Sequence, residues 1–139
     1  MSQRLLDEAA LRRSALLYAR GADRRDRALW ASLMTPDCRL EGPGFTLQGR
    51  DAILASLDHL AASYVATRHC VHNQTFEIDA DAASGETYCT ADHVYVEDGR
   101  RKVLAWHLRY QDRWRREEGA WRFCERVLVL DWQECRDIE

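Results

Sequence analysis

The chain has few of the residues that interrupt a compact domain. Only 2 of its 139 residues are proline, Pro36 and Pro43, and we find no internal repeat, low-complexity tract or linker. A chain of this length is long enough to bury a core of its own. We therefore expect a single domain over residues 1–139.

Long apolar runs and a strong net charge are also absent. No stretch approaches the ~18 apolar residues of a membrane-spanning helix, and the N-terminal sequence MSQRLLDE lacks the apolar core of a signal peptide. The net charge is −3 at pH 7, from 20 basic and 23 acidic residues. This balance favours neither a nucleic acid nor an anionic membrane as a partner.

Cysteine is present without a recognisable pattern. The chain contains five scattered cysteines, Cys38, Cys70, Cys89, Cys124 and Cys135. An odd number does not suit a disulfide framework, so we expect a reducing, cytoplasmic location. Zinc sites usually show Cys-x-x-Cys or His-x-x-x-His spacing, which is missing here, and no glycine-rich loop could hold a phosphate. We predict neither a metal nor an organic cofactor.

The first part of the chain has a helical pattern. Leucine and alanine recur at near-helical spacing over 5–17, and Gly21 is expected to end this helix. The segment Asp23–Asp26 resembles an N-cap followed by a carboxylate three residues later, which predicts a second helix to about Met34. A third helix is expected over about 49–64.

Beyond residue 66 the hydrophobic pattern alternates with a period of two. Four long strands are predicted, near 67–79, 86–97, 103–116 and 121–132, with a short extra strand near 38–41. The connections between the long strands are short and contain Gly or Asp, as antiparallel hairpins require. Helices followed by strands indicate an α+β domain, with three N-terminal helices on a strongly curved, mainly antiparallel sheet. Such a sheet forms a cone with a cavity inside.

Candidate site residues lie on the predicted strands. Arg126 shares a face of the last strand with Leu128 and other apolar residues. A buried arginine needs a carboxylate or an anionic ligand, so Arg126 is either half of a structural salt bridge or an electrophile that stabilises an oxyanion. On the second strand, Asp92 lies either at a wet rim or paired inside a pocket.

The first long strand carries the candidate base. Val71 and Phe76 are out of phase, so we expect a one-residue bulge near Asn73. His69 and His72 face opposite sides of a regular strand, and His69, in phase with Val71, is the candidate for the cavity. The alternative is a hydrogen-bonded core histidine.

Two residues of the helical region also have two interpretations. Asp23 is either the N-cap of the second helix or a site acid. Tyr18, five residues earlier, is either an ordinary core residue or part of the same cavity wall.

Several short motifs together resemble one family. They are Tyr18-x4-Asp23-Arg24-Arg25-Asp26, Thr67-Arg68-His69-x3-Asn73, Arg109-Tyr110-x-Asp112-Arg113-Trp114, and Gly119-x-Trp121-Arg122 with Arg126 and Asp131-Trp132. They span nearly the whole chain, and the set is similar to SnoaL-like proteins of the NTF2-like superfamily. The branch it most resembles contains scytalone dehydratase, bile-acid 7α-dehydratase and hexachlorocyclohexane dehydrochlorinase.

The resemblance implies roles for individual residues. Asp23 and His69 match the Asp–His dyad of that branch, and Arg126 matches a pocket arginine. Tyr18 matches the tyrosine of the bile-acid enzyme where the dehydrochlorinase carries lysine, which argues against dehydrochlorination. Asp92 falls at the spacing of a further acid in the bile-acid enzyme. The resemblance also implies a homo-oligomer, with a trimer preferred over a dimer.

These residues suggest an elimination reaction. His69 would act as general base, Asp23 would fix its tautomer, Tyr18 would donate a hydrogen bond, and Arg126 would stabilise developing negative charge. We predict a cofactor-independent lyase that removes water or another small fragment.

The substrate is expected to be small, hydrophobic and ring-containing. Its predicted binding residues are Trp30, Phe45, Val71, Trp106 and Leu128. Two alternatives stay open: an isomerase or aldol-type cyclase with the same dyad, and a non-catalytic binding or assembly module.

Overall fold

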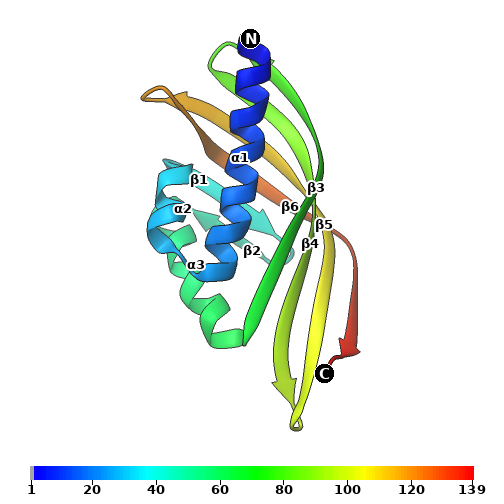
Figure 1. The fold of residues 1–139 in the computed structure, drawn as a ribbon. Coiled ribbons are helices and arrows are strands. Elements are labelled where there is room, and N and C mark those ends of the chain that lie inside the picture. The colour runs from blue at the N-terminus through cyan, green and yellow to red at the C-terminus, as the bar shows by residue number, and fades with distance from the viewer. Residues whose placement is uncertain (1) are drawn as a thin grey trace.

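The computed structural model describes residues 2–139, in which three helices cover one face of a six-stranded sheet (Figure 1). The helices are α1 (Gln3–Arg24), α2 (Arg27–Leu33) and α3 (Arg50–Ser63). The strands are β1 (Met34–Gly42), β2 (Phe45–Gln48), β3 (Ala66–Asp79), β4 (Ala82–Glu97), β5 (Arg100–Glu117) and β6 (Ala120–Asp137). Within residues 2–139, no helix is both long and apolar enough to cross a membrane.

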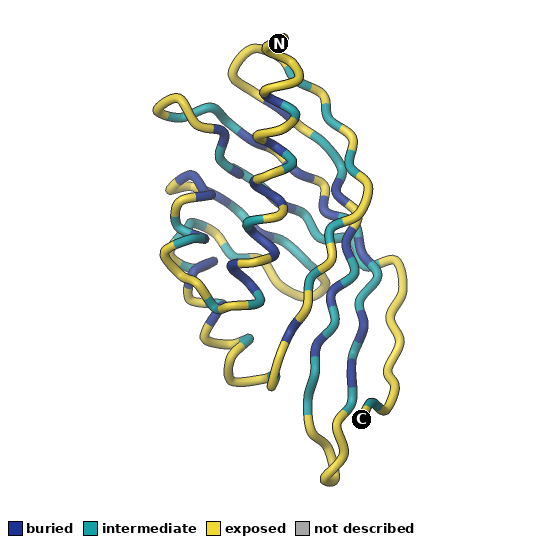
Figure 2. Tube along the Cα trace, viewed as in Figure 1, coloured by how far each residue is buried: buried dark blue, intermediate teal, exposed yellow. Residues whose placement is uncertain are grey.

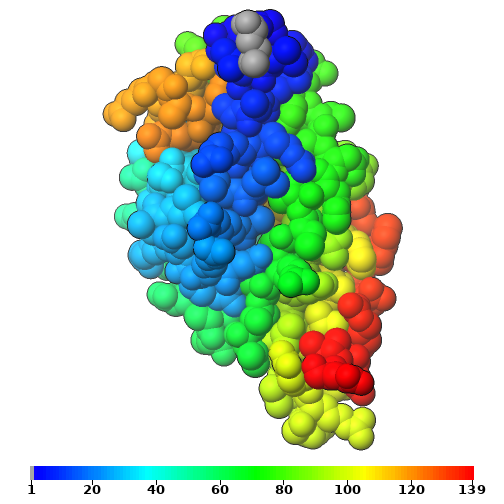
Figure 3. All heavy atoms as spheres, in the orientation of Figure 1, coloured from blue at the N-terminus to red at the C-terminus, as the bar shows by residue number. Residues whose placement is uncertain are grey.

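The sheet has the order β2-β1-β6-β5-β4-β3. β1 runs parallel to β6, and the other neighbouring strands pair antiparallel. The predicted α+β fold, with three helices on a curved and mainly antiparallel sheet, is therefore confirmed. The sheet is curled (Figure 1), and the end of β4, the start of β5 and the end of β6 extend beyond the helices (Figure 3).

The two predicted helix boundaries near residue 21 are wrong. α1 continues through Gly21 to Arg24 and ends where Arg25 adopts a left-handed conformation, with φ 53°. Gly21 serves packing instead, because an added Cβ would collide with the indole of Trp30. The N-cap of α2 is Asp26, whose side chain accepts from the backbone N–H of Leu29 at 3.0 Å. The carboxylate of Asp23 is therefore free for other contacts.

The predicted irregularity in β3 is present. The pairing register between β3 and β4 shifts between Val71 and Gln74, as expected for a bulge near Asn73. Because of this bulge, residues before and after it can both present apolar side chains to the helices. The extra strand expected near 38–41 is also found, as part of the longer β1.

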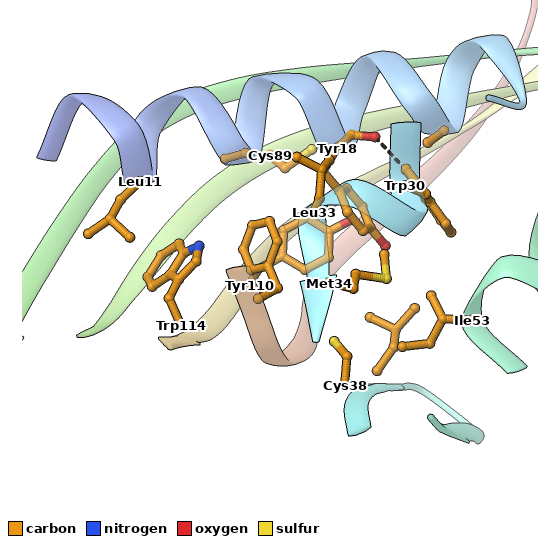
Figure 4. Packing of buried hydrophobic residues seen from close by; sticks show 14 of the residues in the cluster. Leu11, Tyr18, Trp30, Leu33, Met34, Cys38, Ile53, Cys89, Tyr110 and Trp114 are labelled. Atoms are coloured by element: carbon orange, nitrogen blue, oxygen red, sulfur yellow. Dashed lines mark hydrogen bonds between the residues drawn. The ribbon is translucent and has the colours of Figure 1, made fainter. Parts of the chain in front are cut away.

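The core lies between the three helices and the concave face of the sheet, where buried segments gather in Figure 2. Trp30, Trp114 and Phe123 are among its largest fully buried side chains. The Trp30 ring stacks on Tyr18 at 4.5 Å between centroids, and its indole N–H donates to the Tyr18 carbonyl at 2.9 Å (Figure 4). These contacts fix α2 against α1.

One ion pair is buried in this core. Arg126 Nε donates to Asp112 Oδ1 at 2.7 Å, and the two side chains are 2% and 0% exposed. The two residues face each other directly in the β5–β6 register, and the hydroxyl of Thr87 also donates to Asp112, at 2.7 Å. Both oxygens of the Asp112 carboxylate thus accept hydrogen bonds.

Arg126→Met alone should destabilise the fold strongly. It leaves the Asp112 charge buried without a partner, for which we expect a loss of about 3–5 kcal/mol of unfolding free energy. Arg126→Met combined with Asp112→Asn should lose less, because no charge stays buried. Urea unfolding of the two variants measures the difference, and equal losses would contradict this account.

Candidate active site

A cavity of about 540 Å³ lies between the helix layer and the concave face of the sheet. Its wall is mostly apolar and aromatic, and its polar side chains are those of histidines, tyrosines and one serine. Within residues 2–139, no Asp, Glu, Lys or Arg is among the lining residues. Such a wall suits an uncharged, ring-containing ligand.

Asp23 and His69 meet at this cavity. His69 Nδ1 lies 2.7 Å from Asp23 Oδ1, within the distance expected for a hydrogen bond. The backbone N–H of His69 donates to Asp23 Oδ2 at 2.9 Å, and the hydroxyl of Thr67 donates to Oδ1 at 3.1 Å. An ionised carboxylate can only accept, so Nδ1 is the donor in this contact, and Nε2 is the ring nitrogen left for the cavity that His69 lines.

The end of α1 explains how these two residues come together. Asp23 lies in the last turn of the helix, and Arg25 terminates it. The Arg25 guanidinium donates to the hydroxyl of Thr67 at 2.6 Å, which ties the helix end to the start of β3. Thr67 and His69 alternate with exposed residues on β3 and therefore share its inner face.

Tyr18 lines the cavity as expected, but Arg126 does not. The Arg126 guanidinium lies behind the wall, 4.3 Å from the ring centroid of Tyr18 and 3.7 Å from that of Tyr110. The prediction that Arg126 points into the cavity is wrong, because Asp112 directly opposite on β5 binds the guanidinium. Of the two interpretations of Arg126, the structural salt bridge agrees with the structure.

Asp92 also lies away from the cavity. It is opposite Arg68 in the β3–β4 register, on the other face of β4 from the lining residues Ala91 and His93. Asp92 is therefore not among the residues that line the cavity, contrary to the expectation that it belongs to the site. Both faces of β4 carry apolar residues, so alternation alone does not say which one faces inward.

Among the lining residues that the sequence did not point to is His93. It lines the cavity at 7% exposure, and its ring centroid lies 6.1 Å from that of His69 and 5.6 Å from that of Trp106. Its Nδ1 lies 3.1 Å from the carbonyl oxygen of Leu104. Burial lowers the pKa of His93, while the Leu104 contact opposes this change. His93 thus places a second imidazole at the cavity wall beside His69.

Four of the five predicted binding residues line the cavity: Trp30, Phe45, Trp106 and Leu128. Val71 is not among them and packs against the core instead. It shares the inner face of β3 with His69 but lies farther along the strand, beyond the reach of the cavity. His72, as expected, points elsewhere: it is exposed and its Nε2 lies 2.8 Å from the Thr90 hydroxyl.

A family model described as a SnoaL-like domain matches residues 3–127. The chain belongs to the SnoaL-like domain family. A search of curated proteins gives no match for this SnoaL-like domain.

Solved structures share the fold of this SnoaL-like domain. A Mycobacterium tuberculosis protein of unknown function is 25% identical, with a TM-score of 0.82, and the match covers 93% of this chain and 74% of that one. A putative scytalone dehydratase from Novosphingobium aromaticivorans is 22% identical, with a TM-score of 0.83 and coverage of 98% and 90%. A hexachlorocyclohexane dehydrochlorinase from Novosphingobium barchaimii is 20% identical, with a TM-score of 0.84 and coverage of 96% and 92%.

Possible metal ligands of this SnoaL-like domain are dispersed. Across residues 2–139, no three His, Cys, Asp or Glu side chains are grouped so that they could hold a metal ion. The five cysteines are free thiols, and burial raises the pKa of Cys38 and of Cys89 to about 12.

The SnoaL-like domain should lose stability in acid partly through His93. Burial lowers the pKa of His93 below its ordinary value of 6.5, so the unfolded chain takes up this proton first as the pH falls. Its contribution to the unfolding free energy is therefore present above about pH 6.5 and lost as the pH falls further. Urea unfolding at about pH 8 and about pH 5 measures this loss. An identical pH dependence in His93→Gln would contradict the assignment.

Proposed function

We propose that this SnoaL-like domain is a cofactor-independent lyase that eliminates water or another small fragment from a small, hydrophobic, ring-containing substrate. The contact between Asp23 and His69 at the wall of an apolar cavity carries this proposal. A neutral imidazole that is hydrogen-bonded through one nitrogen and free at the other is suited to act as a general base. Solved structures with this fold, named as a putative scytalone dehydratase and a dehydrochlorinase, support an elimination.

The residues suggest the following steps. His69 Nε2 takes a proton from a carbon of the substrate, and the electrons of that C–H bond form the new double bond as the neighbouring C–O bond breaks. Asp23 stabilises the imidazolium that forms. The proton then passes from His69 to the departing oxygen, so that water leaves and neutral His69 is restored. The hydroxyl of Tyr18 can donate to the carbonyl or departing oxygen.

The aromatic wall supports the ring-containing substrate. Trp30, Phe45 and Trp106 line the cavity together with aliphatic side chains, and no charged residue is among the described lining, which suits a substrate that is uncharged before the reaction. An isomerase or an aldol-type cyclase would use the same Asp23–His69 contact, because these reactions share the proton abstraction and differ in the fate of the carbanion.

His69→Ala should lower turnover by about 10²–10⁴-fold, the usual effect of losing a general base. Asp23→Asn should lower turnover by a similar factor, because the amide favours the wrong tautomer of His69. Tyr18→Phe should lower turnover less, if a water replaces the hydroxyl. His72→Ala is the matched control, since His72 is exposed on the same strand. The measurement is turnover of a hydroxylated cyclic ketone selected by screening. Near wild-type turnover by His69→Ala would show that the base is another group.

We also propose that the chain forms a homo-oligomer, with a trimer preferred over a dimer. The convex face of the sheet exposes Tyr88, Val96 and Trp132 at 38%, 57% and 64%, and exposed apolar groups on one face favour association. Trp132→Glu should weaken the assembly. Light scattering at micromolar concentration measures the mass in solution, and a monomer of the unaltered chain would refute the proposal.

A further inference from the structure

Two tyrosines form a continuous part of the cavity wall. Tyr18 on α1 and Tyr110 on β5 both line the cavity, and their rings meet edge to face with centroids 5.9 Å apart. They lie close together at the centre of the packed side chains in Figure 4.

A single guanidinium supports both rings from behind. Arg126 Cζ lies 4.3 Å from the Tyr18 centroid and 3.7 Å from the Tyr110 centroid, and Phe123 covers it at 4.3 Å. At these distances a desolvated cation is attracted to the face of an aromatic ring. Arg126 thus fixes the positions of the two tyrosines without reaching the cavity itself.

The ion pair that includes Arg126 has a defined direction. Its carboxylate end, Asp112, accepts from Arg126 at 2.7 and 3.1 Å and from the Thr87 hydroxyl at 2.7 Å. Its cationic end lies against the tyrosine rings. The positive end of this buried dipole therefore faces the two rings that line the cavity, in a place where Arg126 itself is only 2% exposed.

Both phenols stay protonated in this environment. Burial raises the pKa of Tyr18 and of Tyr110, and the Arg126 cation opposes that increase. A phenol that remains protonated while a cation withdraws electron density from its ring is a stronger hydrogen-bond donor. Such donors suit an oxygen on which negative charge develops.

We propose that Arg126 is a positioning residue that acts through Tyr18 and Tyr110, and that it prepares their hydroxyls to bind a negatively charged oxygen of the reacting substrate. The inference rests on the proposed function in that this oxygen is the one that gains charge when His69 removes the proton.

Ligand binding tests the proposal without turnover. In a His69→Gln background, which removes the base, we would compare the affinities for 4-nitrophenolate and for 4-nitroanisole at a pH at which nitrophenol is ionised. The two probes have similar shapes, but only the first presents a charged oxygen. The parent should prefer the phenolate, and Arg126→Met with Asp112→Asn should reduce that preference about tenfold. Arg126→Lys alone, which retains the positive charge, should keep most of the preference for the phenolate.

Arg116 offers the matched control. Its guanidinium lies 4.3 Å from the Trp121 centroid and 3.2 Å from Asp7, so the same kind of stacked ion pair occurs away from the cavity lining. Arg116→Met with Asp7→Asn should leave the preference unchanged. Tyr18→Phe should lower the preference. When the Arg126–Asp112 charges are removed from the Tyr18→Phe variant, the further loss of preference should be smaller than the loss they cause in the parent.

Three results would overturn the proposal: no preference for the phenolate in the parent, an unchanged preference in the Arg126–Asp112 variant, or an equal loss in the Arg116–Asp7 control. Because binding is measured without the base, a failed elimination leaves this preference measurable. Equally, if the Arg126–Asp112 variant keeps the preference for the phenolate, the proposed role of His69 is unaffected.

Discussion

The carboxylate of Asp23 joins the end of α1 to the start of β3, and the cavity depends on this contact. It accepts hydrogen bonds from the backbone and ring of His69 and from the hydroxyl of Thr67. The same contact that positions the helix on the sheet therefore also sets the orientation of the imidazole. Arg25 reinforces it by ending α1 and donating to Thr67.

The cavity combines an uncharged wall with charges one layer behind it. Asp23 lies behind His69, and Arg126 lies behind Tyr18 and Tyr110. Each charge is hydrogen-bonded within the protein, so it does not require a charged ligand. On the proposed function, a neutral ring would enter an apolar space in which His69 accepts a proton and the tyrosines stabilise negative charge.

The fold could be predicted because the change in hydrophobic period near residue 66 is a local property of the sequence. The phase of β3 correctly placed His69 inward and His72 outward. Features that depend on contacts between distant segments were missed. Gly21 packs against Trp30 rather than ending α1, and Arg126 pairs with Asp112 through the β5–β6 register. His93 was missed because either face of β4 could have been the inner one.

The tautomer of His69 decides whether its imidazole can act as a base in the cavity. Nuclear magnetic resonance of ¹⁵N-labelled histidine distinguishes protonated from unprotonated ring nitrogens at neutral pH. We expect a proton on Nδ1, hydrogen-bonded to Asp23, and an unprotonated Nε2 facing the cavity, with this pattern lost in Asp23→Asn. A proton on Nε2 in the unaltered protein would contradict the account, because His69 could not then accept a proton from a substrate in the cavity.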